Sequence, residues 1–173
     1  MKATPDQAAW DDESLRIAHA AGELLRQKDR ELEANPAEAV LDLAFHTARE
    51  QLPQGQLVYN DYMSWEPQHA KHCDDVLRLL EGFRKRGTPV DALGIQSHIE
   101  MFDIDPATGV GPYDEAGWRR FLDEVVGMGY RLLITEFDVK DKALPANIAE
   151  RDQKVAEFAR RYFDVMLEYG DHL

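Results

Sequence analysis

Polar residues that suit acid–base chemistry stand at the ends of three apolar segments of the sequence. They are Asn60, Asp61 and Tyr62 after the first segment, Gln96 and His98 in the second, and Glu136 and Asp138 in the third. Carboxylates beside an imidazole are groups that proteins use for general acid–base and nucleophilic catalysis. Because these segments contain neither a GxSxG motif nor a Cys–His pair, the chemistry that they predict is carboxylate-based.

Each of these residues, taken alone, also has a structural interpretation. A strand-end histidine can be a hydrogen-bonded core residue, a glutamate can simply be exposed, and Asn60-Asp61 can form a turn. The same groups can be considered as ligands for a divalent ion. Only one histidine is available there, however, and Gln96 and Asn60 are weak ligands, so we predict no metal and no cofactor. The gathering of an amide, an imidazole and several carboxylates favours a functional site.

Helices and strands alternate along the sequence from residue 36 onward. Apolar residues at helical spacing predict helices over 36–50, 70–86, 114–127 and 147–168. Continuous apolar runs predict strands over 56–62, 91–99 and 130–139, with a loop rich in Asp, Gly and Pro over 103–114. This α/β alternation predicts a parallel sheet covered by helices, either open or closed into an eight-stranded barrel. No glycine-rich phosphate loop follows any strand, so a nucleotide-binding open sheet lacks its usual motif.

The predicted strands determine where the polar residues lie. The carboxyl ends of parallel strands meet at one edge of the sheet, and ligands of α/β proteins bind at that edge. Side chains two residues apart on a strand point to the same face. We therefore expect Gln96 and His98 to share one face, and Glu136 and Asp138 to share one face, along a common edge.

The charge balance of the chain limits its partners. The formal net charge of the 173 residues is -13, and neither nucleic acid nor an anionic membrane is expected as a partner, because either would need a basic patch. The chain starts without an apolar signal core and has no run of about 18 apolar residues, so we expect a soluble chain without a signal peptide. The single cysteine, Cys73, allows no intrachain disulfide and is predicted to pack within a helix.

Three motifs resemble one family when they are taken together. "VYNDY", "ALGIQSHI" and "LLITEFDV", in this order and at these intervals, resemble strands five, six and seven of glycoside hydrolase family 10, the endo-β-1,4-xylanases. The similarity runs from about Asn35 to about Tyr169. It implies a partial (β/α)8 barrel over 35–173, made of parallel strands five to seven with their helices. Residues 1–34 are predicted to form a separate, highly charged helical segment. Members of this family are usually secreted, but the compartment of this chain stays open.

The resemblance implies a role for each polar residue. Glu136 matches the catalytic nucleophile, His98 the histidine that hydrogen-bonds it, and Asp138 the carboxylate that orients the histidine. The residues expected to bind substrate are Asn60, Tyr62, Trp65 and Gln96. Tyr62 and Trp65 would offer an aromatic platform, and Gln96 matches the amide beside the nucleophile.

Two features depart from the family pattern. The acid/base glutamate of the family ends strand four, in a stretch reading roughly Trp-Asp-Val-Val-Asn-Glu, and residues 1–34 contain no such stretch. Met63 stands where the family has an asparagine after "NDY". Strands one to four and strand eight are therefore not expected in this chain, and three parallel strands cannot close a barrel.

The sequence is compatible with two functions of different classes. One is a retaining glycoside hydrolase that acts on β-1,4-xylan and is inactive or incomplete unless a second carboxylate acts as the acid. Asp61, Glu66, Glu100 or another chain are the sources considered for that carboxylate. The other function is a non-catalytic module that binds carbohydrate or protein. The expected partner is xylan or a xylo-oligosaccharide, and open barrel edges would favour self-association or completion by another chain.

Overall fold

The structure, a computed structural model, describes residues 36–100, 113–142 and 144–173. The chain divides into two compact units, Met1–Gly55 and Gln56–Leu173. The helix predicted over 1–34 and most of the loop predicted over 103–114 lie outside the described residues. The proposed boundary between a segment 1–34 and a barrel 35–173 stays a prediction.

The described element of the first unit is helix α2, Pro36–Gln51, which confirms the helix predicted over 36–50. Proline suits the first helical turn, because the N–H that it lacks would have no partner within the helix. The Arg49 guanidinium donates to the carbonyl oxygens of Pro53 at 3.3 Å and of Gly55 at 2.6 Å. These two bonds hold the turn that follows the helix.

The helices of the second unit agree with their predicted bounds to within one residue. They are α3 (Ala70–Arg86), α4 (Glu115–Gly127) and α5 (Ile148–Leu167), with the short 3-10 turns η1 (Pro67–His69) and η2 (Gly170–His172). No described helix is long and apolar enough to cross a membrane.

The ends of these helices have local causes. Gly87 ends α3 in the left-handed region with a φ of 72°, which glycine adopts without steric cost. The Asp114 carboxylate accepts from the N–H of Gly117 at 2.9 Å and caps the start of α4. The Asn147 side chain accepts from the N–H of Ala149 at 3.1 Å and caps α5 in the same way.

A three-stranded parallel sheet forms the centre of the second unit. Strands β1 (Val58–Asp61), β2 (Ala92–Ile95) and β4 (Arg131–Ile134) are ordered β1-β2-β4. Asn60 pairs with Gly94, and Gly94 pairs with Leu133, so these three residues lie at one level across the sheet. In the described part of the chain β1 and β4 are the two edge strands of this sheet, and they do not pair with each other to close a barrel. The parallel sheet predicted from the sequence is confirmed.

Two of the predicted strands are interrupted, which corrects the continuous strands expected over 91–99 and 130–139. Strands β3 (His98–Glu100) and β5 (Asp138–Lys140) pair in parallel as a separate two-stranded sheet. Between β2 and β3 the backbone of Ser97 adopts a φ of 59°, a left-handed conformation that no extended strand contains. Gln96 and His98 therefore do not lie on one continuous strand, and neither do Glu136 and Asp138. The alternation of side chains along a strand, from which we expected each pair to share a face, does not apply to them.

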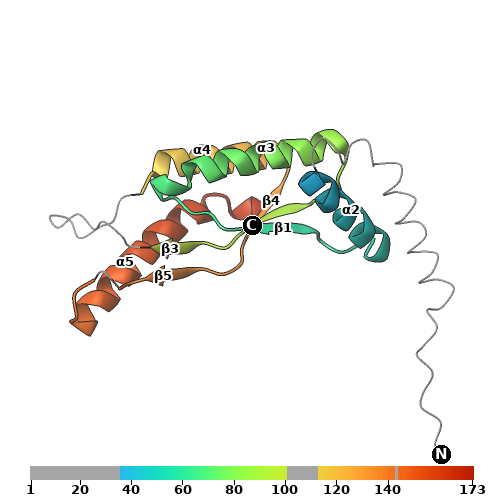
Figure 1. Cartoon of the computed structure of the whole chain (residues 1–173). Helices are drawn as coiled ribbons and strands as arrows, with labels where there is room; N and C mark the ends of the chain where they lie inside the picture. Colours follow the sequence, from blue (N-terminus) through green and yellow to red (C-terminus); the bar gives the residue numbers. More distant parts are fainter. Residues whose placement is uncertain (1–35, 101–112, 143) are drawn as a thin grey trace, which may run out of the picture. The chain divides into compact units, whose positions relative to one another are not determined.

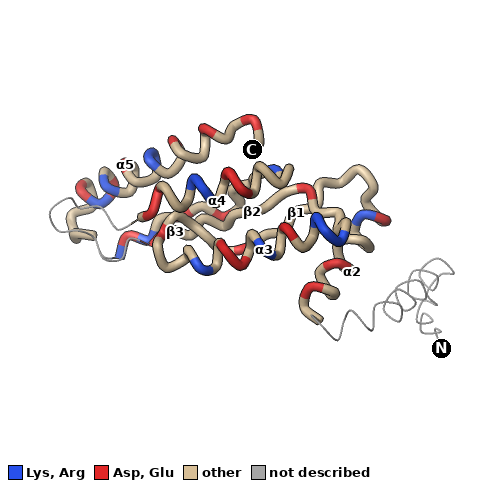
Figure 2. Tube along the Cα trace, turned by 90° about the horizontal axis from the view of Figure 1, so that it is seen from above, with Lys and Arg blue, Asp and Glu red and all other residues tan. Residues whose placement is uncertain are grey.

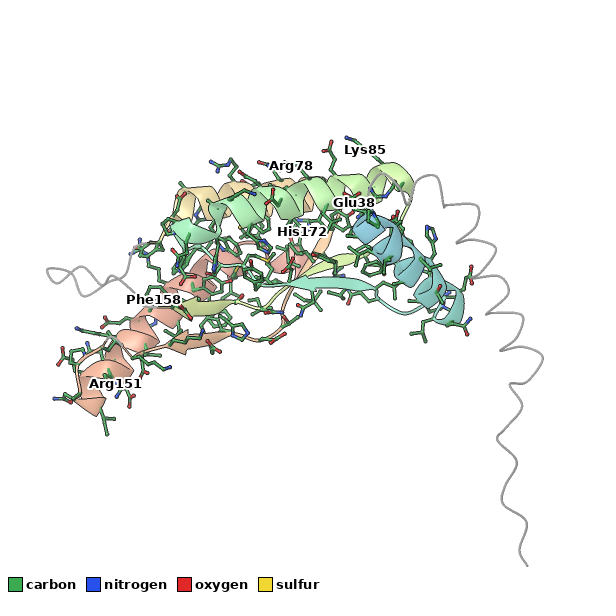
Figure 3. All side chains as sticks on the ribbon, viewed as in Figure 1. Glu38, Arg78, Lys85, Arg151, Phe158 and His172 are labelled. Carbon is green, nitrogen blue, oxygen red and sulfur yellow. The ribbon has the colours of Figure 1, made fainter. Side chains whose placement is uncertain are left out.

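Helices cover one face of the three-stranded sheet. Helices α3 and α4 lie side by side over this face (Figure 1), and α5 runs on the side of α4 away from α3 (Figure 2). Buried side chains of this layer are Val76, Leu80 and Phe83 from α3, Trp118, Phe121, Leu122 and Val125 from α4, and Leu93, Ile95 and Leu132 from the sheet. Arg78 and Lys85 project outward from α3, away from the sheet (Figure 3).

The predicted packing role of Cys73 is confirmed. This free cysteine lies on α3 with 7% of its surface exposed. Burial is the main cause that raises the pKa of its thiol to about 12, so the neutral thiol is the form present near pH 7.

Candidate active site

The carboxyl ends of the three strands bring the polar residues to one edge of the sheet. Asp61, Ile95 and Ile134 lie at one level in the parallel register. The ladder continues one step further, since the N–H of Gln96 donates to the carbonyl of Asp61 at 3.1 Å and the N–H of Thr135 donates to that of Ile95 at 3.0 Å. Glu136 follows directly after this edge.

Glu136 is contacted on both of its carboxylate oxygens. The Asn60 amide, from β1, donates from Nδ2 to Oε1 at 3.2 Å. The His98 ring, from β3, places Nε2 at 3.3 Å from Oε2. The Glu136 side chain is 46% exposed, so it remains open to a reactant while two side chains fix its orientation.

His98 lies between two carboxylates. Its Nδ1 is 2.7 Å from Oδ2 of Asp138, its direct partner in the register of β3 and β5, and its Nε2 faces Glu136. A carboxylate offers only acceptors, so both contacts are donor–acceptor pairs when both ring nitrogens carry a proton. The ring then places one positive charge between two negative ones. The three residues that the resemblance predicts to act together, Glu136, His98 and Asp138, are thus adjacent, although Glu136 and Asp138 do not lie on one continuous strand as expected.

Asn60 is itself held in place by two neighbours that the sequence analysis did not name. The Thr135 hydroxyl donates to Oδ1 of Asn60 at 2.8 Å, which leaves the amide Nδ2 to face Glu136. Gly94 gives Asn60 its space, because a Cβ on Gly94 would lie 2.5 Å from Asn60 Oδ1. Thr135 could have been found from its position one residue before Glu136, whereas the need for glycine at position 94 appears only from the strand pairing.

Tyr62 presents an exposed aromatic ring beside this edge. Its side chain is among the exposed large apolar groups, at 53%, and its ring stacks on His72 of α3 with centroids 4.1 Å apart and planes 9° apart. One ring face is therefore covered by an imidazole.

The Asp61 carboxylate contacts both members of the stacked pair, Tyr62 and His72. Its Oδ1 accepts from the backbone N–H of Tyr62 at 2.7 Å and lies 3.2 Å from Nε2 of His72. Its Oδ2 accepts from the Tyr59 hydroxyl at 2.7 Å. Burial, followed by this hydrogen bond, raises the pKa of Tyr59 well above its ordinary value, so the phenol stays a donor.

Trp65 is not the surface platform that the sequence analysis expected. Its side chain is 1% exposed and packs against Tyr113 at 4.5 Å and against Phe158 and Tyr162 at 5.2 Å between ring centroids. A ring enclosed in this way cannot stack on a ligand from solvent. Met63, in the place of the family's asparagine, is also buried, with 1% exposed.

Gln96 lies at the same edge with a half-buried side chain. Its position beside Asp61 agrees with the predicted rim location.

The three carboxylates considered as the second acid are engaged elsewhere. Asp61 is bound as described above. Glu66 is buried, accepts from the N–H of Glu100 at 2.7 Å and is bound by the Ser64 hydroxyl. Glu100 forms an ion pair with Lys140. None of these interactions directs a carboxylate of the described residues toward Glu136.

Comparison with known proteins identifies the family of this chain. The sequence model of glycosyl hydrolase family 10 matches residues 17–172. Endo-1,4-beta-xylanase C of Paenibacillus barcinonensis is 31% identical over 140 residues, which cover 76% of this chain and 12% of that protein. Endo-1,4-beta-xylanase B of Thermotoga neapolitana is 29% identical over 128 residues, which cover 74% of this chain and 34% of that protein. The chain thus spans about a third or less of the length of these relatives.

Solved structures of the same family share the fold. The family 10 enzyme of Paenibacillus barcinonensis matches with a TM-score of 0.60 and 27% identity, over 75% of this chain and 35% of that one. Native xylanase 10B of Thermotoga maritima matches with a TM-score of 0.57 and 27% identity, over 76% of this chain and 37% of that one. These likenesses confirm the predicted fold class, a partial (β/α)8 barrel whose sheet is not closed in the described residues. Because the family model covers most of the sequence, the chain belongs to glycosyl hydrolase family 10.

Proposed function

We propose that this chain carries the nucleophile half of a retaining glycosidase site that acts on β-1,4-xylan. The observation that carries the proposal is the Glu136 carboxylate, held between the Asn60 amide and the His98 ring, with Asp138 behind the ring. A retaining glycosidase needs an ionised carboxylate as nucleophile and a second carboxyl group about 5–5.5 Å away as acid and base. Glu136 has the exposure and the hydrogen-bond donors that suit the first role.

The proposed reaction proceeds in two displacements. A Glu136 oxygen attacks the anomeric carbon of a xylose unit, the bond to the leaving-group oxygen breaks, and the acid supplies a proton to that oxygen. Water then attacks the same carbon, loses its proton to the same group, and releases Glu136 as a carboxylate. Two inversions give net retention.

Substrate contacts are proposed for residues at the same edge. Tyr62 offers an aromatic face onto which the apolar side of a sugar ring can pack, since its other face is covered by His72. Asn60 and Gln96 offer amides that suit sugar hydroxyls. Trp65 is not included, because it is enclosed in the core.

A second function, binding of carbohydrate without catalysis, is favoured by one observation. Asp61, Glu66 and Glu100 are all committed to other partners, and no acid is assigned among the described residues. Loss of a general acid lowers rates by about 10²–10⁴ when the leaving group is poor. In that case the exposed Tyr62 ring would serve binding alone.

The experiment that tests the proposal uses a substrate that needs no acid. A dinitrophenyl 2-deoxy-2-fluoro-β-xylobioside can form a bond from its anomeric carbon to a Glu136 oxygen as dinitrophenolate leaves. We expect the intact mass to increase by one fluoro-xylobiosyl group, and peptide mapping to place that group on Glu136.

Two variants make this result specific. Glu136→Gln should give no adduct, whereas Glu81→Gln, which removes an exposed carboxylate from α3, should react like the parent. An unlabelled but folded parent chain would reject the nucleophile role and leave the binding function. Labelling without turnover of xylan would show that the nucleophile half is assembled and that no acid assists the departure of a poor leaving group.

A further prediction concerns the space beside Asn60. Gly94→Ala places a Cβ 2.5 Å from Asn60 Oδ1, so the amide must rotate and lose its bonds to Glu136 and Thr135. We expect the labelling of Glu136 to slow roughly tenfold, which corresponds to about 1.4 kcal/mol. The rate constant of adduct formation, followed by mass spectrometry, measures this effect.

A double-mutant cycle provides the control for that prediction. Asn60→Ala should slow labelling by a similar factor, and Gly94→Ala should then add little to it, because both changes remove the same contact. Additive effects of the two substitutions would show that Gly94 acts by another route.

A further inference from the structure

Ser97 has a backbone conformation that its residue type disfavours. Its φ is 59°, and no other described residue except glycine has a positive φ. The left-handed region brings Cβ too close to the following carbonyl, so such residues persist only where their surroundings enforce them. Ser97 is also fully buried, with 0% of its surface exposed, and it stands between Gln96 and His98. Strain at such a position calls for an interaction that holds it.

Ser97 has bonds to three different elements. Its hydroxyl lies 2.7 Å from the Tyr162 hydroxyl of α5 and 3.3 Å from the carbonyl oxygen of Ile95 at the end of β2. Its own carbonyl accepts from the N–H of Asp138, the first residue of β5, at 3.3 Å. The residue thus joins the end of one strand to the start of another and to a helix.

Tyr162 contacts both of the chain segments that interrupt the strands. Its hydroxyl bonds Ser97, which precedes His98, and its ring stacks on Phe137, which lies between Glu136 and Asp138, with centroids 5.5 Å apart and planes 24° apart. Tyr162 is fully buried, with 0% exposed, and it also packs edge-on against Trp65. Burial raises the pKa of its hydroxyl, which therefore stays protonated and can pair with Ser97.

We propose that Tyr162 is a positioning residue, which sets His98 against Glu136 through its hydroxyl on Ser97 and its ring on Phe137. His98 lies in β3, whereas Glu136 lies in the segment between β4 and β5, where no strand pairing connects it to β3. A single side chain that touches the residue next to each of them fixes the distance between them. This inference rests on the proposed function only in so far as Glu136 is the nucleophile, because the geometry of His98 can be measured without any substrate.

The test removes one hydroxyl at a time. Tyr162→Phe keeps the ring on Phe137 and deletes the bond to Ser97, and Ser97→Gly deletes the same bond while relieving the positive φ. The first measurement is the nitrogen chemical shifts of the His98 ring, read by NMR through its carbon-bound protons and identified by their loss in His98→Ala. We expect both variants to stay folded and to shift these nitrogen signals.

The second measurement is the rate at which the dinitrophenyl fluoro-xylobioside labels Glu136, which should fall about tenfold in both variants. If the parent is not labelled, the proposed function fails, and the His98 signals still decide the positioning role. Tyr169→Phe is the matched control. It removes the hydroxyl of a tyrosine two residues after α5, which donates to Asp123 at 2.8 Å and to the carbonyl of Arg119 at 3.2 Å, and neither partner is a residue of the site. It should leave the His98 signals and the labelling rate unchanged.

The outcome that overturns the inference is defined by the same data. If Tyr162→Phe and Ser97→Gly lower the melting temperature but leave the His98 nitrogen shifts of the folded protein as in the parent, the pair is only structural. If Tyr162→Phe does not fold, Ser97→Gly decides alone, because glycine adopts the required φ without cost.

Discussion

Replacement of Glu136 by alanine is expected to lower the release of dinitrophenolate from dinitrophenyl β-xylobioside by up to about 10⁶-fold, the scale of loss when a covalent nucleophile is removed. The physical reason is that Asn60 and His98 can orient Glu136 but neither can replace its carboxylate in bonding to the anomeric carbon. Absorbance of the released phenolate measures the rate.

Rescue of the Glu136→Ala variant by azide tests whether Glu136 is the nucleophile. In Glu136→Ala the anion can enter the space left by the carboxylate, bond to the anomeric carbon and displace dinitrophenolate. One displacement inverts the centre, so the product should be the α-xylobiosyl azide, which NMR identifies by its anomeric coupling. Glu136→Gln should show no such rescue, because its amide fills the same space. A β-configured azide, or a variant as fast as the parent, would contradict the nucleophile role.

The second large effect is expected on stability. Trp65→Ala should reduce the free energy of unfolding by about 3–5 kcal/mol, the usual cost of deleting a buried aromatic ring. Trp65 is 1% exposed and contacts Tyr113, Phe158 and Tyr162, so its loss leaves a cavity between the loop after β1 and helix α5. Urea unfolding followed by far-ultraviolet circular dichroism measures the change.

Tyr62→Ala is the comparison for that effect. The Tyr62 side chain is 53% exposed and makes its main ring contact with His72, so its loss should cost about 1 kcal/mol or less. The effects on sugar binding should be the reverse of those on stability. Tyr62→Ala should weaken binding, whereas a Trp65 variant that still folds, such as Trp65→Phe, should retain it. If Trp65→Phe abolished binding without loss of stability, the platform role first expected for Trp65 would be restored.

The sequence by itself determined the helices and the parallel sheet. Helix bounds followed from the spacing of apolar residues, and the structure shows local causes at the helix ends, such as the cap at Asp114 and the glycine at position 87. The same local patterns placed Glu136 and His98 at strand ends, and three motifs together indicated the family. All these signals act over a few residues, which is why they can be read without a fold.

Tertiary structure decided how the site is assembled. The apolar runs that predicted strands over 91–99 and 130–139 contain no signal for their interruption, because the bond that holds the left-handed Ser97 comes from Tyr162, 65 residues further along the chain. The need for glycine at position 94 likewise arises from Asn60 on the neighbouring strand.

Burial of individual side chains was also decided by the fold. Trp65 follows a polar motif and resembles a surface aromatic in sequence, yet α5 encloses it. Asp61, Glu66 and Glu100 are three acids of equal promise in the sequence, and only their partners in space show that each is already bound. Residue type fixes what a side chain can do chemically, but its neighbours, contributed by distant segments, fix whether it is free to do so.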